Sequence, residues 1–273
     1  MNKHTSTYAL ILLMALACSF GTGCSKVNSG TPTYSVASLN VVNVLPNSNP
    51  LILVQGSISS AIGEFSGITP LSYASTAVLT PKTGSETLYA IQSNIDTATV
   101  GSKGPDFMFA GELNFEAGGL YSLFITGADT TAPDTLFLQD ILPSITDSSV
   151  DIRFVNLSTG SNPISINLEG SSNGSEVASL AYKGITGFKE YSNNSTTVDY
   201  LFVVRDAASG DSLTQFDFLA SGSYNNGNGL TDPSNNPNNN GTLLTFRHVT
   251  IAVYGSESAN TNNPLNTMLI DNY

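Results

Sequence analysis

Short runs of apolar and β-branched residues, each bounded by Gly, Pro, Asn or Ser, recur along most of the chain. In the run GLYSLFITG at 119–127, the residues Tyr121, Leu123 and Ile125 form one alternating set, and the residues at 120, 122, 124 and 126 form the other. This period of two is that of a β-strand. Strands are predicted at 37–45, 50–56, 72–80, 86–93, 106–115, 119–127, 135–141, 150–157, 163–170, 187–192, 199–206, 213–221, 243–255 and 266–272. No segment after the first 23 residues sustains a helical period, so an all-β fold is expected.

The two halves of the chain repeat the same strings in the same order. The matches are VNVLPNSNP at 42–50 with VNLSTGSNP at 155–163, SGITPL at 66–71 with KGITGF at 183–188, LYSLFITG at 120–127 with HVTIAVYG at 248–255, and the apolar runs that end at Asp140 and Asp271. We therefore predict two tandem antiparallel β-sandwiches, at 34–142 and 149–273, joined by a linker at 143–148. The repeated Asn43 and Asn156 are expected to hydrogen-bond the backbone of their own turns.

The N-terminus has the layout of an export signal. A polar start with Lys3 precedes an apolar run at 8–20 that is too short to span a bilayer, and small residues then lead to a cysteine. We predict a lipoprotein signal peptide at 1–23, acylation of Cys24, and a polar tether at 24–33. Cys18, which also follows small residues, is the alternative acylation site. Several acyl chains on one terminus attach a protein firmly to a membrane.

Composition adds an acidic charge and a shortage of ionisable groups. The formal charge is −12, and loss of Lys3 with the signal peptide makes it −13. Charged residues make up 11% of the chain, and only three of them are arginines. Nucleic-acid binding is not expected, because phosphates require Lys and Arg.

Three features together resemble a known but uncharacterised protein family. They are the strand opening with Val-Asn and then Ser-Asn-Pro, the strand GLYSLFITG with its following Leu-Gln-Asp, and the lipoprotein start Cys-Ser-Lys. The family comprises Bacteroidetes envelope lipoproteins of tandem immunoglobulin-like β-sandwiches, and the resemblance covers most of the mature chain. It implies immunoglobulin-like topology and an outer-membrane location, and it supplies no catalytic residue. The turns at 45–47 and 158–160 depart from the acidic or Pro-rich turn that is common in the family.

The sequence contains little that predicts catalysis. His248 is the one histidine beyond the signal peptide, and we interpret it as a surface or edge-strand residue rather than a general base. There is no Gly-x-Ser-x-Gly motif, no His pair or Cys pair with ligand spacing, and no calcium-loop motif. We expect no enzymatic activity, no metal site and no cofactor.

Candidate ligand-binding residues are Tyr191, Asn193, Asn194 and Tyr224. The last lies in an Asn-rich loop at 221–241 that interrupts the second half. Tyrosines with neighbouring amides suit stacking on sugar rings, but tyrosines serve equally to fill sandwich cores. These residues are the basis of an alternative functional hypothesis, in which the protein is a glycan-binding accessory lipoprotein.

The leading hypothesis is a non-enzymatic, lipid-anchored protein of the outer membrane that acts as a binding, adhesion or scaffolding module. Its expected partners are the membrane, through the lipid, and an envelope protein or polysaccharide. The sequence fits attachment on either the surface or the periplasmic side. A pilus-type subunit that assembles by strand addition is a further alternative.

Overall fold

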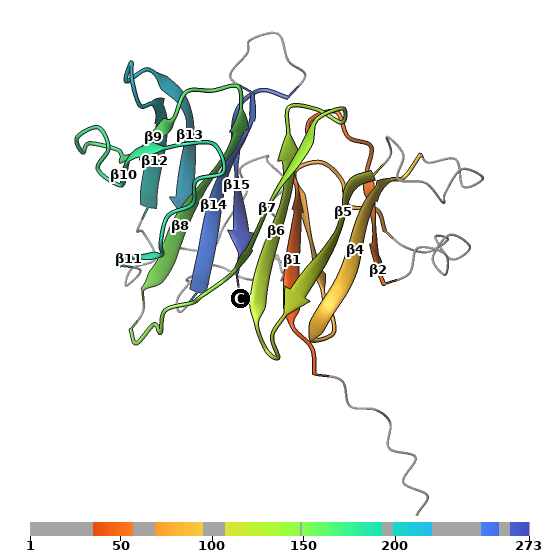
Figure 1. The fold of residues 1–273 in the computed structure, drawn as a ribbon. Helices are drawn as coiled ribbons and strands as arrows, with labels where there is room; N and C mark the ends of the chain where they lie inside the picture. Colours follow the sequence, from red (N-terminus) through yellow and green to blue (C-terminus); the bar gives the residue numbers. More distant parts are fainter. Residues whose placement is uncertain are drawn as a thin grey trace, which may run out of the picture. The chain divides into compact units, whose positions relative to one another are not determined.

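The computed structural model describes residues 35–56, 69–94, 107–147, 149–192, 199–219, 247–256 and 263–272. These residues contain strands and connections and no helix, which confirms the predicted all-β fold (Figure 1). The strands are β1 (Ser38–Asn43), β2 (Leu51–Gln55), β3 (Ser75–Leu79), β4 (Gly84–Gln92), β5 (Phe107–Phe115), β6 (Leu120–Gly127), β7 (Pro133–Gln139), β8 (Val150–Thr159), β9 (Ile164–Leu168), β10 (Val177–Leu180), β11 (Lys189–Tyr191), β12 (Asp199–Asp206), β13 (Ser212–Leu219), β14 (Arg247–Ser256) and β15 (Asn266–Asp271).

Each half of the chain forms two sheets that enclose a core. In the first half the sheets have the orders β3-β1-β6-β7 and β2-β4-β5, and in the second β11-β8-β14-β15 and β10-β9-β12-β13. The first core contains Ala37, Leu39, Val41, Leu45, Leu51, Leu71, Leu88, Ala90, Met108, Leu113, Phe115, Tyr121, Leu123 and Ile125. The second contains Val150, Ile152, Phe154, Ile164, Ile166, Leu180, Tyr191, Phe202, Val204, Phe216, Phe218, Val249, Ile251 and Val253.

One strand pair in each half departs from the predicted antiparallel pattern. β1 pairs with β6 in parallel, and β8 pairs with β14 in parallel. The chain visits the opposite sheet between the two members of each pair, and this crossover lets them run in the same direction. The remaining strand pairs among the described residues are antiparallel.

The strand β10 is absent from the sequence prediction. It spans only four residues, and its pairing with β9 is interrupted by a register shift between Val177 and Leu180. A run this short, with a single β-branched residue, does not display a period of two. The other strands lie within the predicted runs to within one or two residues.

The middle strands β6, β8 and β14 are buried along almost their whole length. Alternate side chains of β8, such as Val150 and Ile152, enter the core of their own sandwich. The others, such as Val155 and Leu157, enter a separate apolar cluster shared by both halves. Contacts accordingly group Ser35–Tyr273 into one compact unit, and the domain boundaries predicted within it stay predictions.

Candidate functional site

The outer faces of two sheets, one from each half, meet in an apolar interface. The sheets are β3-β1-β6-β7 and β11-β8-β14-β15. Their shared cluster contains Val42, Val44, Phe124, Val155, Leu157, Ala252, Tyr254, Met268 and Ile270. Burial of apolar surface on this scale favours a fixed arrangement of the two sandwiches.

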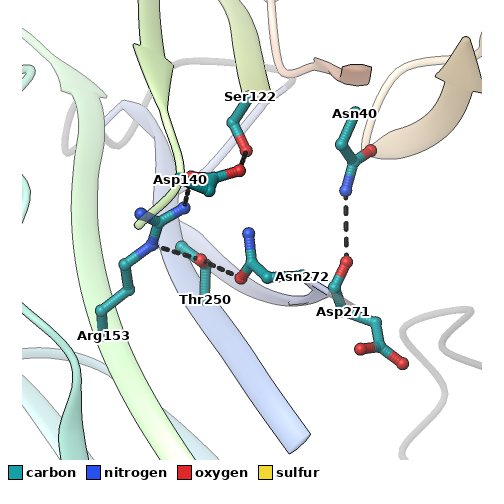
Figure 2. Close-up of polar contacts among 7 residues, drawn as sticks. All are labelled: Asn40, Ser122, Asp140, Arg153, Thr250, Asp271 and Asn272. Carbon is teal, nitrogen blue, oxygen red and sulfur yellow. Dashed lines mark hydrogen bonds and ion pairs between the residues drawn. The ribbon is translucent and has the colours of Figure 1, made fainter. Parts of the chain in front are cut away.

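A row of buried polar side chains lies beside this cluster (Figure 2). Arg153 Nη2 is 2.5 Å from Asp140 Oδ1, and the two side chains are 4% and 0% exposed. The second oxygen of Asp140 accepts a hydrogen bond from Ser122 Oγ at 2.7 Å. Arg153 Nε donates to Thr250 Oγ1 at 2.8 Å, and Thr250 donates to Asn272 Oδ1 at 2.5 Å. The ion pair therefore joins the end of the first half to the beginning of the second.

The polar row is built from equivalent positions of the two halves. Asn40 lies opposite Ser122 in the parallel pair β1–β6, and Arg153 lies opposite Thr250 in the parallel pair β8–β14. Asn40 Nδ2 donates across the interface to the carbonyl oxygen of Asp271 at 3.3 Å (Figure 2). The duplication seen in the sequence is thus repeated in the strand register.

The register corrects one of the sequence matches. The N–H of Asp140 donates to the carbonyl of Leu120 at 2.8 Å, and the N–H of Asn272 donates to the carbonyl of His248 at 2.8 Å. Asn272, and not Asp271, is therefore the counterpart of Asp140. The predicted match was wrong by one residue, a slip that in a pleated strand places a side chain on the opposite face.

Aromatic and backbone groups cover the charged end of this row. The guanidinium carbon of Arg153 lies 4.6 Å from the centre of the Phe188 ring, within the range of a cation–π contact. Phe188 also packs edge-on against His248, with ring centres 5.5 Å apart. The cation is therefore separated from solvent by an apolar ring as well as neutralised by its acid.

His248 fixes the connection between the halves. It lies on the central strand β14 and is 8% exposed, so the interpretation as a surface or edge residue was wrong. Its Nε2 is 2.7 Å from the carbonyl oxygen of Pro143 and 3.3 Å from Asp151 Oδ2. Burial raises the pKa of the Asp151 carboxyl, and His248 offsets part of that effect.

A small pocket lies at one end of the interface, where turns of both halves meet. Its volume is about 200 Å³. The lining residues are Pro46, Asn47, Ala128, Thr159, Gly160, Ser256 and Asn263. Six of them lie at or just after the ends of β1, β6, β8 and β14, and Asn263 precedes β15, so equivalent strand ends contribute from each half. Asn47 and Gly160 both adopt left-handed backbone, with φ of 59° and 72°.

The repeated asparagines anchor these turns, as predicted. Asn43 Oδ1 accepts the N–H of Leu45 at 3.2 Å, and Asn156 Oδ1 accepts the N–H of Ser158 at 3.0 Å. Each side chain also donates to a more distant carbonyl, that of Leu71 or Leu180. Both asparagines are fully buried. The repeated motif therefore shapes the walls of the pocket.

Of the predicted ligand-binding residues, Tyr191 lies in the second core. It is 6% exposed, and its ring packs edge-on against Tyr200 and Phe202 with centres 5.3 and 5.5 Å apart. Its hydroxyl donates to Glu176. Burial, together with this carboxylate, raises the pKa of Tyr191. The ring offers no open face to a sugar in this position.

The other predicted residues are Cys24, Asn193, Asn194 and Tyr224. They lie outside the described residues, as do the signal peptide, the tether and the loop 221–241. Their predicted roles stay predictions.

The Arg153–Asp140 pair and the pocket were not predicted from the sequence. A signal for the arginine was present, since the alternation of VDIRFVNL puts Arg153 on the same face as Val155 and opposite Ile152 and Phe154. On that face Arg153 lies between Asp151 and Val155, within an otherwise apolar run, and a charged residue at such a position indicates a buried partner. The pocket left no comparable signal, because turn residues of any exposed loop have the same composition.

Comparisons with known proteins do not assign the chain to a family. No family model and no curated protein matches it. A streptococcal virulence factor, whose structure concerns alpha-glucan binding, has 8% identity over 79% of this chain and 93% of its own, with a TM-score of 0.24. A candidate adhesin from Bacteroides ovatus has 12% identity over 87% and 92%, with a TM-score of 0.21. TM-scores this low do not allow the fold or the function of these two proteins to be assigned to this chain.

The described residues hold neither a metal-binding cluster nor a membrane-spanning helix. They contain no cluster of three or more His, Cys, Asp or Glu that could hold a metal ion. No helix of membrane-spanning length and hydropathy occurs in this part of the chain.

Proposed function

We propose that the protein is a non-enzymatic, lipid-anchored component of the outer membrane that presents two rigidly joined β-sandwiches as a binding, adhesion or scaffolding module. The observation that carries this proposal is the interface between the halves. An apolar cluster and the buried pair of Arg153 and Asp140 hold both sandwiches in one compact unit. A rigid body of this kind suits the presentation of a surface better than it suits relative motion of two domains.

The proposed anchor rests on the sequence. Cys24 follows small residues at the end of an export signal, and the polar segment 24–33 separates it from the first strand. The net charge of −12, or −13 without the signal peptide and its Lys3, keeps an exported protein soluble and weakly repelled by anionic surfaces.

The bonding of the buried polar groups supports a non-enzymatic role. Arg153, Asp140 and Thr250 direct their hydrogen bonds to one another or to neighbouring protein groups. His248 faces a backbone carbonyl of the linker. A general base must instead reach a proton of a bound substrate. These groups therefore act as structural contacts between the halves.

Strand lengths favour this proposal over a pilus-type subunit. The outermost strands β2, β3, β10 and β11 are only three to five residues long. The longer outermost strands lie beside one another in pairs, β5 with β7 and β13 with β15. Short or covered edges are poor templates for the addition of a donor strand.

The proposal is tested in cells that express the wild type, Cys24→Ala or Cys18→Ala. Growth with an alkyne-bearing palmitate should label the wild type and Cys18→Ala and leave Cys24→Ala unlabelled in the soluble fraction. Cross-linking of intact cells should then join the wild type to discrete envelope components. Label retained by Cys24→Ala would contradict the anchor, and an absence of cross-linked partners would contradict the binding role.

A further inference from the structure

The pocket at the end of the interface has a rigid frame. Asn43 and Asn156 fix the turns that carry Pro46, Asn47 and Gly160, through hydrogen bonds to the turn backbone. The apolar cluster between the sheets holds the two sets of turns against each other. A site whose walls are fixed before binding does not lose affinity to the ordering of loops.

The described residues that line the pocket have no ionisable side chain. Its functional groups are the amides of Asn47 and Asn263, the hydroxyls of Thr159 and Ser256, and backbone groups. Without a charged side chain, the pocket has no strong partner for an ionic ligand, since recognition of charge relies on charge-assisted hydrogen bonds. The net charge of −12 disfavours anions further. A neutral ligand fits this lining best.

The two amides form a pair that has hydrogen-bonding groups to spare. Asn263 Nδ2 donates to Asn47 Oδ1 at 3.1 Å. This bond uses one donor of Asn263 and one acceptor position of Asn47, so the Nδ2 donor of Asn47 and the Oδ1 acceptor of Asn263 take no part in it. Two adjacent hydroxyls of a ligand match them, because each hydroxyl both donates and accepts. The buried ring of Pro46 and the methyl of Ala128 supply apolar surface for ring carbons.

The volume limits the size of the ligand. About 200 Å³ is the share of roughly seven waters in the liquid, and it lies below the roughly 300–1,000 Å³ of pockets that hold drug-sized ligands. One ring therefore enters, and a longer chain must extend outside.

We propose that this pocket binds a single neutral sugar ring, or a terminal residue of a glycan, through its adjacent hydroxyls. The inference deepens the proposed binding function and rests on it. It differs from the glycan hypothesis of the sequence, because it places the site between the halves and not at Tyr191 or Tyr224. With few contacts and no aromatic platform, a Kd of about 1–10 mM is expected for a free monosaccharide.

The test is an NMR titration of the full protein, solubilised from membranes in detergent. Glucose, galactose, mannose and N-acetylglucosamine are each added to about 100 mM, with glucuronate as the anionic counterpart. At least one neutral sugar should give saturable shifts of the Ala128 and Gly160 backbone amides and of the Asn263 side chain. Glucuronate should bind more weakly than that sugar.

Three variants identify the site. Asn47→Gly keeps the left-handed backbone and removes the amide, and it should weaken binding about fivefold, as expected for loss of one hydrogen bond. Ala128→Leu fills the pocket from its exposed rim and should abolish binding. Asn114→Ala, at an exposed position of β5, is the matched control and should bind like the wild type.

Three outcomes would overturn the inference. They are an absence of pocket shifts with all four neutral sugars, undiminished binding by Ala128→Leu, and tighter binding of glucuronate than of the neutral sugars. None of these would alter the palmitate label or the envelope cross-links, so failure of this site is distinguishable from failure of the proposed function.

Discussion

The two halves of the molecule share one strand register but differ in the polar row at their interface. The first half contributes Asn40, Ser122 and Asp140 to this row, and the second contributes Arg153, Thr250 and Asn272 at the equivalent positions. A duplicated sheet that packs on its own copy begins with identical faces. Here a cation stands in one copy and an anion in the other, at positions that are not equivalent.

This difference makes the interface selective. Two copies of the second half, packed in the same way, would place Arg153 beside Asn272 in place of the carboxylate of Asp140. Two copies of the first half would bury Asp140 without a cation. An unpaired buried charge is strongly unfavourable. The charges therefore favour association of the first half with the second and disfavour association of either half with itself.

The largest effect is expected from Asp140→Ala, which leaves Arg153 buried and unpaired. We expect the free energy of unfolding to fall by about 3–5 kcal/mol, measured by urea denaturation of the full chain. The matched control is Asp271→Ala. Asp271 pairs with Arg247 at 2.7 Å, with side chains 43% and 39% exposed, and its loss should cost less than about 1 kcal/mol.

Replacement of both charges sharpens the same comparison. Asp140→Leu combined with Arg153→Met should restore most of the stability lost by Asp140→Ala, because a buried ion pair is replaceable by apolar groups of similar size. A double variant as unstable as Asp140→Ala would contradict this expectation. It would mean that the attraction between Asp140 and Arg153 itself stabilises the fold, and that the loss in Asp140→Ala is not due to an unpaired charge alone.

A slightly smaller loss is expected at the apolar part of the interface. Phe124 and Ala252 occupy equivalent positions of β6 and β14, and both are fully buried in the shared cluster. Phe124→Ala should lower the free energy of unfolding by about 3 kcal/mol through loss of buried surface and the cavity it leaves. Adding Ala252→Phe tests the equivalence of the two positions, since a symmetric interface should regain part of the loss. A double variant less stable than Phe124→Ala would show that the two halves are packed asymmetrically.

Loss of a turn anchor should have a medium effect that is similar in the two halves. Asn43→Ala and Asn156→Ala each remove a buried side chain that both accepts and donates hydrogen bonds. Each should cost about 1–3 kcal/mol, measured by thermal denaturation. A loss confined to one variant would mean that the repeated motif carries its structural role in one half alone.

The strand content and the duplication were readable because each depends on local patterns. Fourteen β-rich runs were identified by their bounding Gly, Pro, Asn or Ser residues, with period-two alternation in several of them, and the repeated Val-Asn and Ser-Asn-Pro strings identified the anchored turns. The parallel pairs β1–β6 and β8–β14 were not predicted. Strand direction within a sheet depends on the whole path of the chain, which no local pattern records.

The candidate site could not be predicted because its parts are distant in the sequence or lack a distinctive composition. Arg153 was visible as a charged residue in an apolar strand, but its partner Asp140 lies beyond a linker, at a strand end that usually faces solvent. His248 was interpreted as a surface or edge residue because it is a lone strand histidine beside an arginine, although the linker carbonyl of Pro143 covers it. Contacts between two sandwiches arise only after each has folded.

The smallest effect is expected at Asp151, and it should depend on pH. Asp151 occupies the row of β8 next to Arg153, opposite His248 on β14 and Glu190 on β11, with Asp147 of the linker near it. Its pKa is raised above the usual value by burial.

The unfolded chain therefore releases the Asp151 proton at a lower pH than the folded chain does. At a pH below the unfolded pKa both states hold the proton, and Asp151 contributes nothing to stability. Stability falls as pH rises from the unfolded pKa through the folded pKa, and the full cost is present above the folded pKa. Asp151→Asn should therefore be more stable than the wild type at pH 7 and equal to it at about pH 3, in urea denaturation at each pH. A variant less stable than the wild type at pH 7 would show that attraction between Asp151 and His248 exceeds the cost of burial.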